Sequence, residues 1–130
     1  MARRRWHGRG RHGRPLLRGY MEPCLLLLLH QDAGHGYDLA QGLDGLGIHD
    51  VDPSLVYRML RGLEEEGLVV SRWDTDSSFG PARRVYSLTE AGNAALLTWV
   101  DELRATDHVL HGFIQAFEEH MASSDGAFHK

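Results

Sequence analysis

Residues 52–70 have the sequence DPSLVYRMLRGLEEEGLVV, which predicts a capped helix that leads directly into a strand. Asp52 is a good capping residue, and Pro53 fits the first helical position, where the missing N–H has no helical partner to lose. The apolar residues of the stretch recur at helical spacing on one face until Gly67, which ends the predicted helix. Beyond Gly67 the apolar period falls to two, as in a strand.

Two further helices are expected before this one. The first contains the leucine run at residues 25–29, begins between Leu17 and Pro23, and ends at Gln31 or Asp32, because leucine-rich sequence without β-branching favours helix. A turn at residues 33–36 then precedes a short second helix, which the glycines at 42, 45 and 47 end. The second helix, its glycine-bearing loop and the helix after Asp52 form a helix-turn-helix unit.

Strand-like residues 68–73 and 83–88 follow, joined by the polar stretch 74–82, and together they predict a hairpin. Thr89 then caps a last helix that extends to about His120. The predicted fold class is therefore mainly α with a small β hairpin (α+β). Its element order is that of a winged helix-turn-helix with a long C-terminal dimerisation helix, in which the helix after Asp52 is the recognition helix and the hairpin is the wing.

Apolar residues repeat every seven positions along the last helix, and further large apolar residues lie beside them. A helix of this length extends past the small domain before it, and its row of apolar side chains would be exposed to water. A partner chain that buries this row is the simplest solution. We therefore expect a homodimer whose interface contains Leu96, Trp99, Leu103, Leu110, Phe113, Ile114 and Phe117. Trp99 either stacks on a planar effector or is part of the interface core, and the sequence leaves both roles open.

The chain has 130 residues and a single cysteine, which excludes an internal disulfide framework. The longest apolar run, at residues 24–29, is too short to span a membrane, and no targeting signal opens the sequence. We expect one small cytoplasmic domain that does not bind a membrane. The thiol of Cys24 is expected to be buried and inert. The expected segments are a disordered basic arm at 1–15, a winged-helix domain at 16–91, the dimerisation helix at 92–121 and a frayed tail at 122–130.

The net charge of −4 hides a strong asymmetry along the chain. Residues 1–18 contain seven arginines and no acid, whereas the remainder contains seven basic residues and 18 acidic ones. A basic arm beside an acidic body is typical of a tail that contacts nucleic acid, and a disordered solubilising leader is the alternative. Arg3, Arg4 and Arg5 are the arm residues that we expect at a DNA backbone.

The polar face of the recognition helix and the wing supply the other candidate DNA contacts. In a helix-turn-helix the second helix enters the major groove, where arginine can bind guanine through two hydrogen bonds, and a wing positions the protein on phosphates. Tyr37, at the start of the second helix, either donates to a phosphate or is half-buried packing. The full set is Tyr37, Ser54, Tyr57, Arg58, Arg61, Arg72, Ser78, Gly80, Arg83 and Arg84.

Other classes of function have weaker support. Nine histidines allow a metal-responsive regulator, but no familiar ligand spacing is present and we expect no metal site and no cofactor. No nucleophile motif or phosphate-binding loop is found in a suitable context, so we expect no enzyme. A winged helix that binds only protein remains an open alternative.

Five blocks of the sequence resemble the PadR family of bacterial transcriptional regulators. They are LLLLL at 25–29, HGYDL at 35–39, DPSLVY at 52–57, LEEEGLV at 63–69 and GPARRVYSLTEAG at 80–92. The blocks keep the order and spacing of the family over about residues 16–92. Two positions depart from it, because Ser54-Leu55 replaces a common Gly-Thr pair and Arg58 stands where many members have proline.

The resemblance implies a DNA-binding regulator of the type with a single C-terminal helix. Such proteins are often repressors that small, frequently aromatic molecules release from DNA. The resemblance therefore implies double-stranded DNA with a near-palindromic operator, a second copy of the chain and a small aromatic effector as partners. The Arg58 departure adds a positive charge to the recognition helix, which is compatible with DNA binding.

Overall fold

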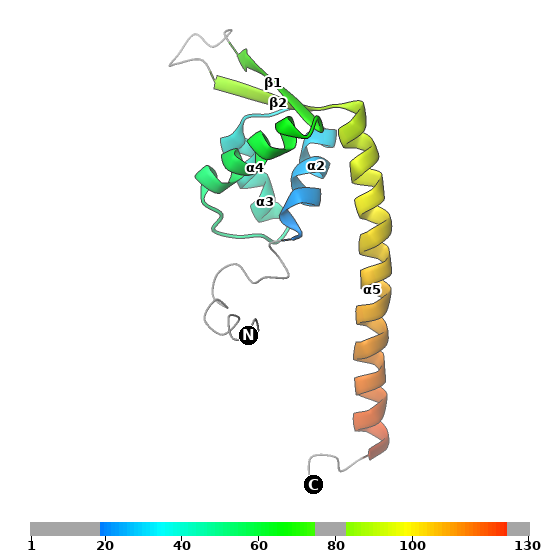
Figure 1. Ribbon diagram of the computed structural model, residues 1–130. Coiled ribbons are helices and arrows are strands. Elements are labelled where there is room, and N and C mark those ends of the chain that lie inside the picture. The colour runs from blue at the N-terminus through cyan, green and yellow to red at the C-terminus, as the bar shows by residue number, and fades with distance from the viewer. Residues whose placement is uncertain (1–18, 75–82, 125–130) are drawn as a thin grey trace, which may run out of the picture. The chain divides into compact units, whose positions relative to one another are not determined.

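The computed structural model describes residues 19–74 and 83–124, and the labels used below follow Figure 1. The elements are α2 (Met21–Gln31), α3 (Gly36–Gly45), α4 (Pro53–Glu65), β1 (Val69–Asp74), β2 (Arg83–Leu88) and α5 (Glu90–Ser124). The chain divides into two compact units, residues 1–96 and 97–130. The first unit contains α2, α3, α4, the hairpin and the beginning of α5, and the second contains the remainder of α5.

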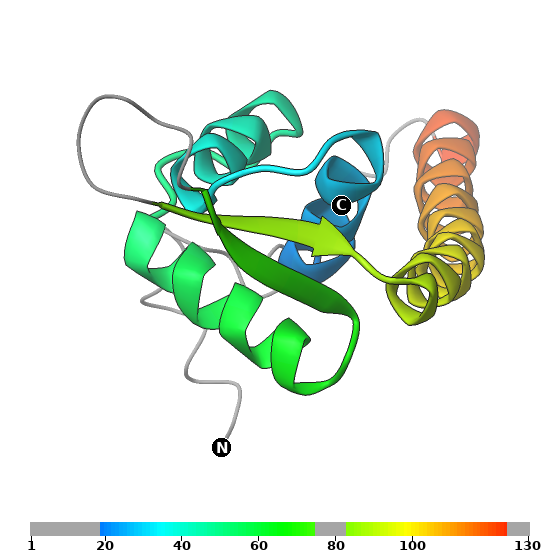
Figure 2. The ribbon, with the colours of Figure 1, turned by 90° about the horizontal axis from the view of Figure 1, so that it is seen from above.

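The core of the first unit lies where the three short helices meet the hairpin. Helix α2 contacts α3 and β2, and α4 contacts α3 and β1 (Figure 2). Leu25 and Leu26 in the middle of α2 have no solvent exposure, and neither do Leu43, Val56 and Leu60 on the other two helices. Burial of side chains of this size supplies the main force that holds such a small domain together. The leucine run is therefore the centre of the fold.

Two glycines end α3 and α4 in the same way. Gly47 has φ +93° and Gly67 has φ +80°, a left-handed conformation that a residue without Cβ adopts at little cost. After Gly67, the N–H of Leu68 donates to the carbonyl of Leu63, and the N–H of Gly67 donates to that of Glu64. These two bonds form a Schellman motif, which satisfies carbonyls that the helix end would otherwise leave unpaired.

The hairpin is a two-stranded antiparallel sheet in which Val69 pairs with Leu88 and Asp74 with Arg83. The segment before α3 forms an antiparallel β-bridge with β2, in which Gly34 and Tyr86 exchange two backbone hydrogen bonds of 2.8 and 3.1 Å. The Tyr86 side chain is 2% exposed and belongs to the core. The hairpin is thus attached to the helices through β2 as well as through the turn after α4.

The start of α5 is fixed to the turn that ends α4. The Thr89 hydroxyl donates to the carbonyl of Gly67 at 2.7 Å and accepts from the N–H of Gly92 at 3.0 Å. A Cβ on Gly92 would overlap the carbonyl oxygen of Leu68, so the helix approaches this turn more closely than any side chain at that position allows. The first turns of α5, up to Leu96, are thereby part of the first unit.

The predicted fold class and element order are confirmed, with differences at element ends. The first strand is shifted by one residue, because Leu68 belongs to the turn at Gly67 and the strand begins at Val69 and ends at Asp74. Helix α4 ends at Glu65 rather than at Gly67. Helix α5 continues to Ser124, so residues 122–124 of the expected frayed tail are helical. The expected arm at 1–15 lies outside the described residues.

Candidate nucleic-acid interface

The amphipathic helix α4 presents a charged face opposite its buried one. Val56, Leu60 and Leu63 are buried against the domain. Arg58 and Arg61 are exposed, as is Ser54 at the helix start. The predicted arrangement of Ser54, Arg58 and Arg61 on one side of the helix is therefore present, and both guanidinium groups are accessible to a ligand.

The cap at the start of α4 uses the backbone N–H of Ser54. The Asp52 carboxylate accepts the backbone N–H of Ser54 at 3.0 Å, and Pro53 follows the cap. The Ser54 N–H is therefore already satisfied, and a negative charge stands at the first turn. This end of α4 does not offer a free anion-binding cluster of backbone N–H groups, so positive side chains must supply the attraction to phosphate.

Tyr57 has a packing contact in addition to its predicted place on the polar face. Its side chain is half-buried, and its ring fills the space that a Cβ atom on Gly36 would need. The ring thus fixes the distance between the start of α3 and α4. This contact gives the aromatic ring a packing role and accounts for a glycine at the first position of α3.

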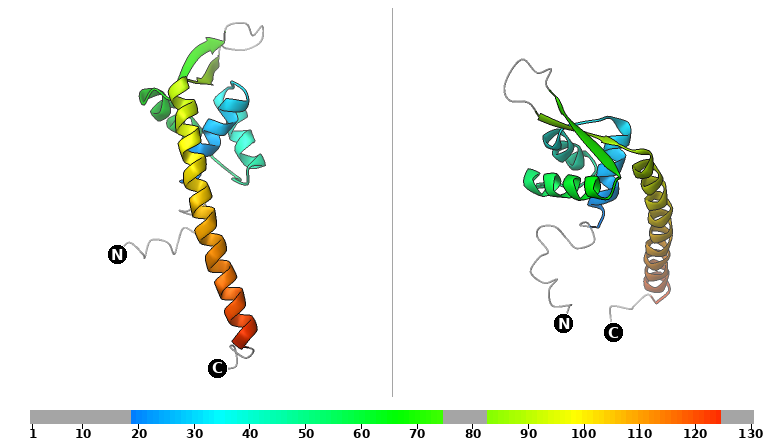
Figure 3. Two further views of the ribbon diagram at one scale, coloured as in Figure 1. Left: turned by 90° about the vertical axis from the view of Figure 1, so that its right-hand side faces the viewer. Right: turned by 45° about the horizontal axis from the view of Figure 1, so that its top comes forward.

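The hairpin lies beside α4 (Figure 3), and its strands carry three further arginines. Arg72 and Arg83 are exposed, whereas Arg84 is half-buried. The Arg84 guanidinium lies 4.8 Å from the centroid of the Trp73 ring, and its Nε donates to Ser71 at 3.1 Å. Arg84 therefore has partners within the described residues, whereas Arg72 on β1 and Arg83 on β2 are exposed there.

A groove of about 470 Å³ lies between α4 and the hairpin. Half of the six arginines in the described part of the chain line it, against one acid, Glu64. Its lining residues are Tyr57, Arg61, Glu64, Trp73, Arg83, Arg84 and Tyr86. Burial raises the pKa of the Tyr86 phenol above its usual value, although Arg84 opposes the shift. The Tyr86 hydroxyl thus stays protonated at neutral pH in a groove of net positive charge.

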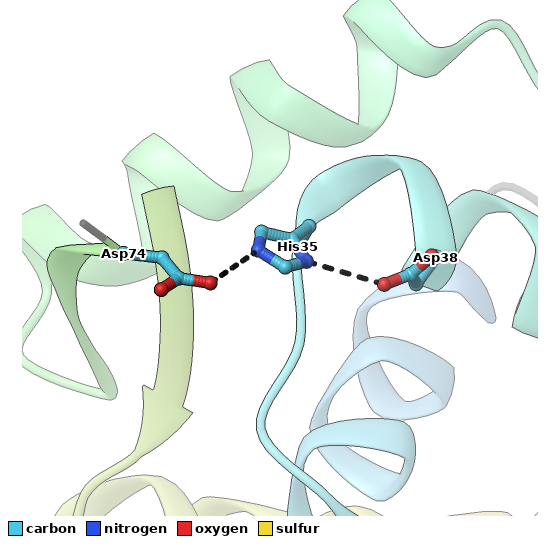
Figure 4. A network of polar contacts seen from close by, with 3 residues as sticks. All are labelled: His35, Asp38 and Asp74. Atoms are coloured by element: carbon cyan, nitrogen blue, oxygen red, sulfur yellow. Dashed lines mark hydrogen bonds and ion pairs between the residues drawn. The ribbon is translucent and has the colours of Figure 1, made fainter. Parts of the chain in front are cut away.

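His35 joins the start of α3 to the end of β1 (Figure 4). Its Nδ1 lies 3.3 Å from Oδ2 of Asp38, and its Nε2 lies 3.5 Å from Oδ2 of Asp74. The second contact is an ion-pair distance without hydrogen-bond geometry. The sequence places His35 in a turn and gives no reason to pair it with Asp74, which is 39 residues away.

Six predicted contacts remain, namely Tyr37, two residues at the tip of the wing and three residues of the arm. Tyr37 is 53% exposed at the start of α3, so its hydroxyl is accessible, and its two proposed roles are not separated. Ser78 and Gly80, at the tip of the wing, lie outside the described residues. Arg3, Arg4 and Arg5 also lie outside them.

Comparison with known proteins identifies the family of this chain. A family model described as the transcriptional regulator PadR-like family matches residues 25–98. The chain belongs to the PadR-like family. The match covers the helices, the hairpin and the beginning of α5, which are the elements that form the candidate interface.

Individual relatives agree with this membership. The PadR-like chain is 29% identical over 114 residues to the transcriptional regulator YqjI of Escherichia coli, covering 85% of this chain and 51% of that protein. It thus spans about half the length of this curated relative. A PadR-like transcriptional regulator structure from Bacillus cereus has a TM-score of 0.70 at 26% identity and covers 78% of this chain and 97% of its own.

A further structure extends the likeness into the C-terminal region. This conserved protein of unknown function, considered a potential transcriptional factor, has a TM-score of 0.73 at 28% identity. The alignment covers 86% of the PadR-like chain and 99% of the other. The winged-helix fold is therefore shared by proteins of nearly this size.

The distal part of α5 in the PadR-like chain carries an exposed apolar stripe. Leu110, Phe113, Ile114 and Phe117 are each more than half exposed, with Phe113 at 70%. Trp99 and Leu103 are half-buried. Leu96 is different, because it is 7% exposed and already belongs to the core of the first unit. Of the expected interface residues, Leu96 therefore has the least surface left for a partner.

Among residues 19–74 and 83–124, no group of three or more histidine, cysteine, aspartate or glutamate side chains is arranged to hold a metal ion. None of the helices in these ranges is long and apolar enough to cross a membrane. Cys24 is 3% exposed, and burial raises the pKa of its thiol.

Proposed function

We propose that this protein binds double-stranded DNA as a homodimer and represses transcription until a small ligand releases it. The observation that carries the proposal is that Arg58 and Arg61 are exposed on α4 and that Arg61 shares a groove with Arg83 of the adjoining hairpin. Arginine is the side chain best suited to bind guanine edges and phosphates through paired hydrogen bonds. Membership of a transcriptional-regulator family supports this use of the surface.

The residues divide between two tasks. Arg58 and Arg61 read base edges, since they lie on the helix that a helix-turn-helix protein inserts into the major groove. Arg72 and Arg83 contact the backbone and hold the protein in register without reading sequence. The arm residues Arg3, Arg4 and Arg5 add contacts to phosphate or to a neighbouring minor groove.

Dimerisation follows from the apolar stripe of α5. Four large apolar side chains more than half exposed on one helix face are costly in water, and a second copy covers them with an identical stripe. A dimer presents two recognition helices related by a dyad. We therefore expect a nearly palindromic operator whose half-sites are separated by about one helical turn, or a multiple of it.

The effector step depends on Trp99. Its indole is half-buried beside the stripe and offers a flat surface to a planar aromatic ligand. Binding at the dimer seam changes the distance between the two recognition helices, which releases the operator. Titration with planar aromatic compounds tests this step. Two quantities are measured: the fluorescence of Trp99, in a variant without the other tryptophans, and the affinity for DNA.

The DNA-binding part is tested by fluorescence anisotropy. The probes are a duplex selected by the protein from a random pool and a shuffled duplex of the same composition. Arg58→Ala should weaken binding to the selected duplex by at least about tenfold and reduce discrimination between the two probes. Arg104→Ala is the matched control, because it removes one exposed positive charge from α5. Equal behaviour of these two variants would contradict a base-reading role for Arg58.

A further inference from the structure

A chain of side-chain contacts connects α4 to both strands of the hairpin. The Ser71 hydroxyl on β1 donates to Oε2 of Glu64 on α4 at 2.8 Å. The same oxygen accepts from Nε of Arg84 on β2 at 3.1 Å, and the Arg84 guanidinium lies over the Trp73 ring. We call Glu64, Ser71, Arg84 and Trp73 the α4–wing relay.

Ser71 uses its full range of polar contacts in the relay. A serine hydroxyl has one proton to donate and lone pairs to accept, and here the proton faces a carboxylate while a guanidinium donates to the oxygen. Both bonds involve a charged partner, which makes them stronger than bonds between neutral groups. Among the small side chains, only serine and threonine combine such a donor and acceptor in one hydroxyl group.

The relay adds a side-chain connection between α4 and the hairpin to the backbone bonds of Gly34 with Tyr86. Glu64 lies near the C-terminal end of α4, three residues after Arg61 and six after Arg58. The relay therefore ties the wing to the same helix that presents the two exposed arginines. Arg61 and Arg83 line the groove that the relay spans.

We propose that Ser71 and Arg84 are positioning residues that set the spacing between the recognition helix and the wing, and that neither makes a direct contact with phosphate. This inference rests on the proposed DNA-binding function and assigns Arg84 a different role from Arg83. Arg83 is exposed and, in the proposed function, contacts the phosphate backbone of DNA, whereas Arg84 is held by Ser71 and Trp73. The relay lets the helix and the wing engage one duplex at the same time.

The test compares Ser71→Ala, Ser71→Thr, Arg84→Lys and Arg83→Gln with the wild-type chain on the selected and shuffled duplexes over a range of salt concentrations. Ser71→Ala leaves the protein charge unchanged and removes both hydrogen bonds. We expect it to weaken binding to the selected duplex by about tenfold, because part of the free energy of the two lost bonds is then needed to order the wing on DNA. Binding to the shuffled duplex and its salt dependence should stay as in the wild type, because no charged side chain is removed and non-specific binding does not require the helix and the wing in one fixed register.

The other variants separate positioning from charge. Ser71→Thr keeps the hydroxyl and should restore discrimination. Arg84→Lys keeps the positive charge but loses the planar stack and Nε, so it should behave like Ser71→Ala. Arg83→Gln should weaken binding to both duplexes and reduce the slope of log affinity against log salt by roughly 0.9 for each subunit, as expected for one lost phosphate contact per protomer.

A readout on the free protein checks the relay itself. Nε–H of Arg84 should exchange slowly in nuclear magnetic resonance spectra of the wild type and rapidly in Ser71→Ala, with circular dichroism confirming that both are folded. The proposal is overturned if Ser71→Ala discriminates as well as the wild type, or if Arg84→Lys binds normally. If the wild-type chain binds the selected and the shuffled duplex equally, the proposed function is contradicted. This outcome differs from the two variant results that would overturn the positioning role.

Discussion

The ring of Tyr57 on α4 lies against the α-carbon of Gly36 at the start of α3, in the space that a Cβ atom would occupy. Gly36→Ala should therefore destabilise the fold by about 1–3 kcal/mol, the usual cost of overpacking. Urea unfolding measures the change. Gly62→Ala is the control, because nothing lies within 4 Å of a Cβ at that helical position. It should raise stability by up to about 1 kcal/mol.

A double-mutant cycle tests the cause of the Gly36 effect. If the ring is responsible, Tyr57→Ala should relieve most of the cost of Gly36→Ala, since the two changes share one contact. Simple addition of the two costs would show that the penalty arises elsewhere in the turn before α3.

His49 should titrate above its ordinary pKa of 6.5. Its Nδ1 lies 2.6 Å from Oδ1 of Asp44, and this hydrogen bond is the main cause of the raised pKa, with a smaller contribution from the Asp50 charge. Because the folded pKa is raised, the stabilisation is complete below pH 6.5 and is lost as the pH rises through the folded value. Resonances of the His49 ring followed against pH measure the midpoint.

Two carboxylate variants check the His49 prediction. Asp44→Asn should return the midpoint towards 6.5, and Asp50→Asn should lower it less. An unchanged midpoint in Asp44→Asn would show that the hydrogen bond does not persist in solution.

A charge placed on the α5 stripe should separate the proposed dimer. Phe113 is 70% exposed in the single chain, so Phe113→Asp costs an isolated monomer little. In a dimer it buries an unpaired carboxylate among apolar side chains, and we expect a loss of dimer affinity on the order of a hundredfold. Sedimentation equilibrium measures it.

Gln115→Asp is the control for the stripe. Residue 115 lies on the opposite side of α5, because two residues turn a helix by about 200°. This variant should associate like the wild type. A wild-type chain that stays monomeric at micromolar concentration would remove the dimer from the proposed function.

Removal of residues 1–15 takes away six arginines and should weaken operator binding. If these groups neutralise phosphates, fewer counterions are released on binding, so the dependence of affinity on salt becomes flatter. Anisotropy titrations at several salt concentrations measure both quantities. Unchanged affinity and slope in the shortened protein would support a solubilising leader instead.

The sequence predicts the elements well where a local residue type determines the backbone. The Asp52-Pro53 start of α4 and the stop at Gly67 are examples, since a capping carboxylate and a left-handed glycine act within a few residues. The one-residue shift of the first strand has a local cause as well. Leu68 has the apolar character of a strand residue but donates its N–H to the end of α4.

The candidate site is less predictable, because arginine types alone do not reveal their partners. Arg83 and Arg84 are neighbours in the sequence, but one is exposed and the other is held by Ser71 and Trp73. That difference depends on the pairing of Trp73 with Arg84 across the hairpin. A long polar connection between the strands leaves this register open to sequence reasoning. The pairing of His35 with Asp74 depends on tertiary structure in the same way.

The carboxylate of Asp52 has a consequence for the time that the protein spends on the wrong DNA. It stabilises α4 by capping it, and it also holds a negative charge at the end of the helix that enters the groove. Every phosphate repels this charge, whereas only the correct bases repay the approach through arginine contacts. If α4 enters the groove as we propose, we expect the protein to dissociate from non-target sites faster than a variant whose helix end attracts phosphate everywhere.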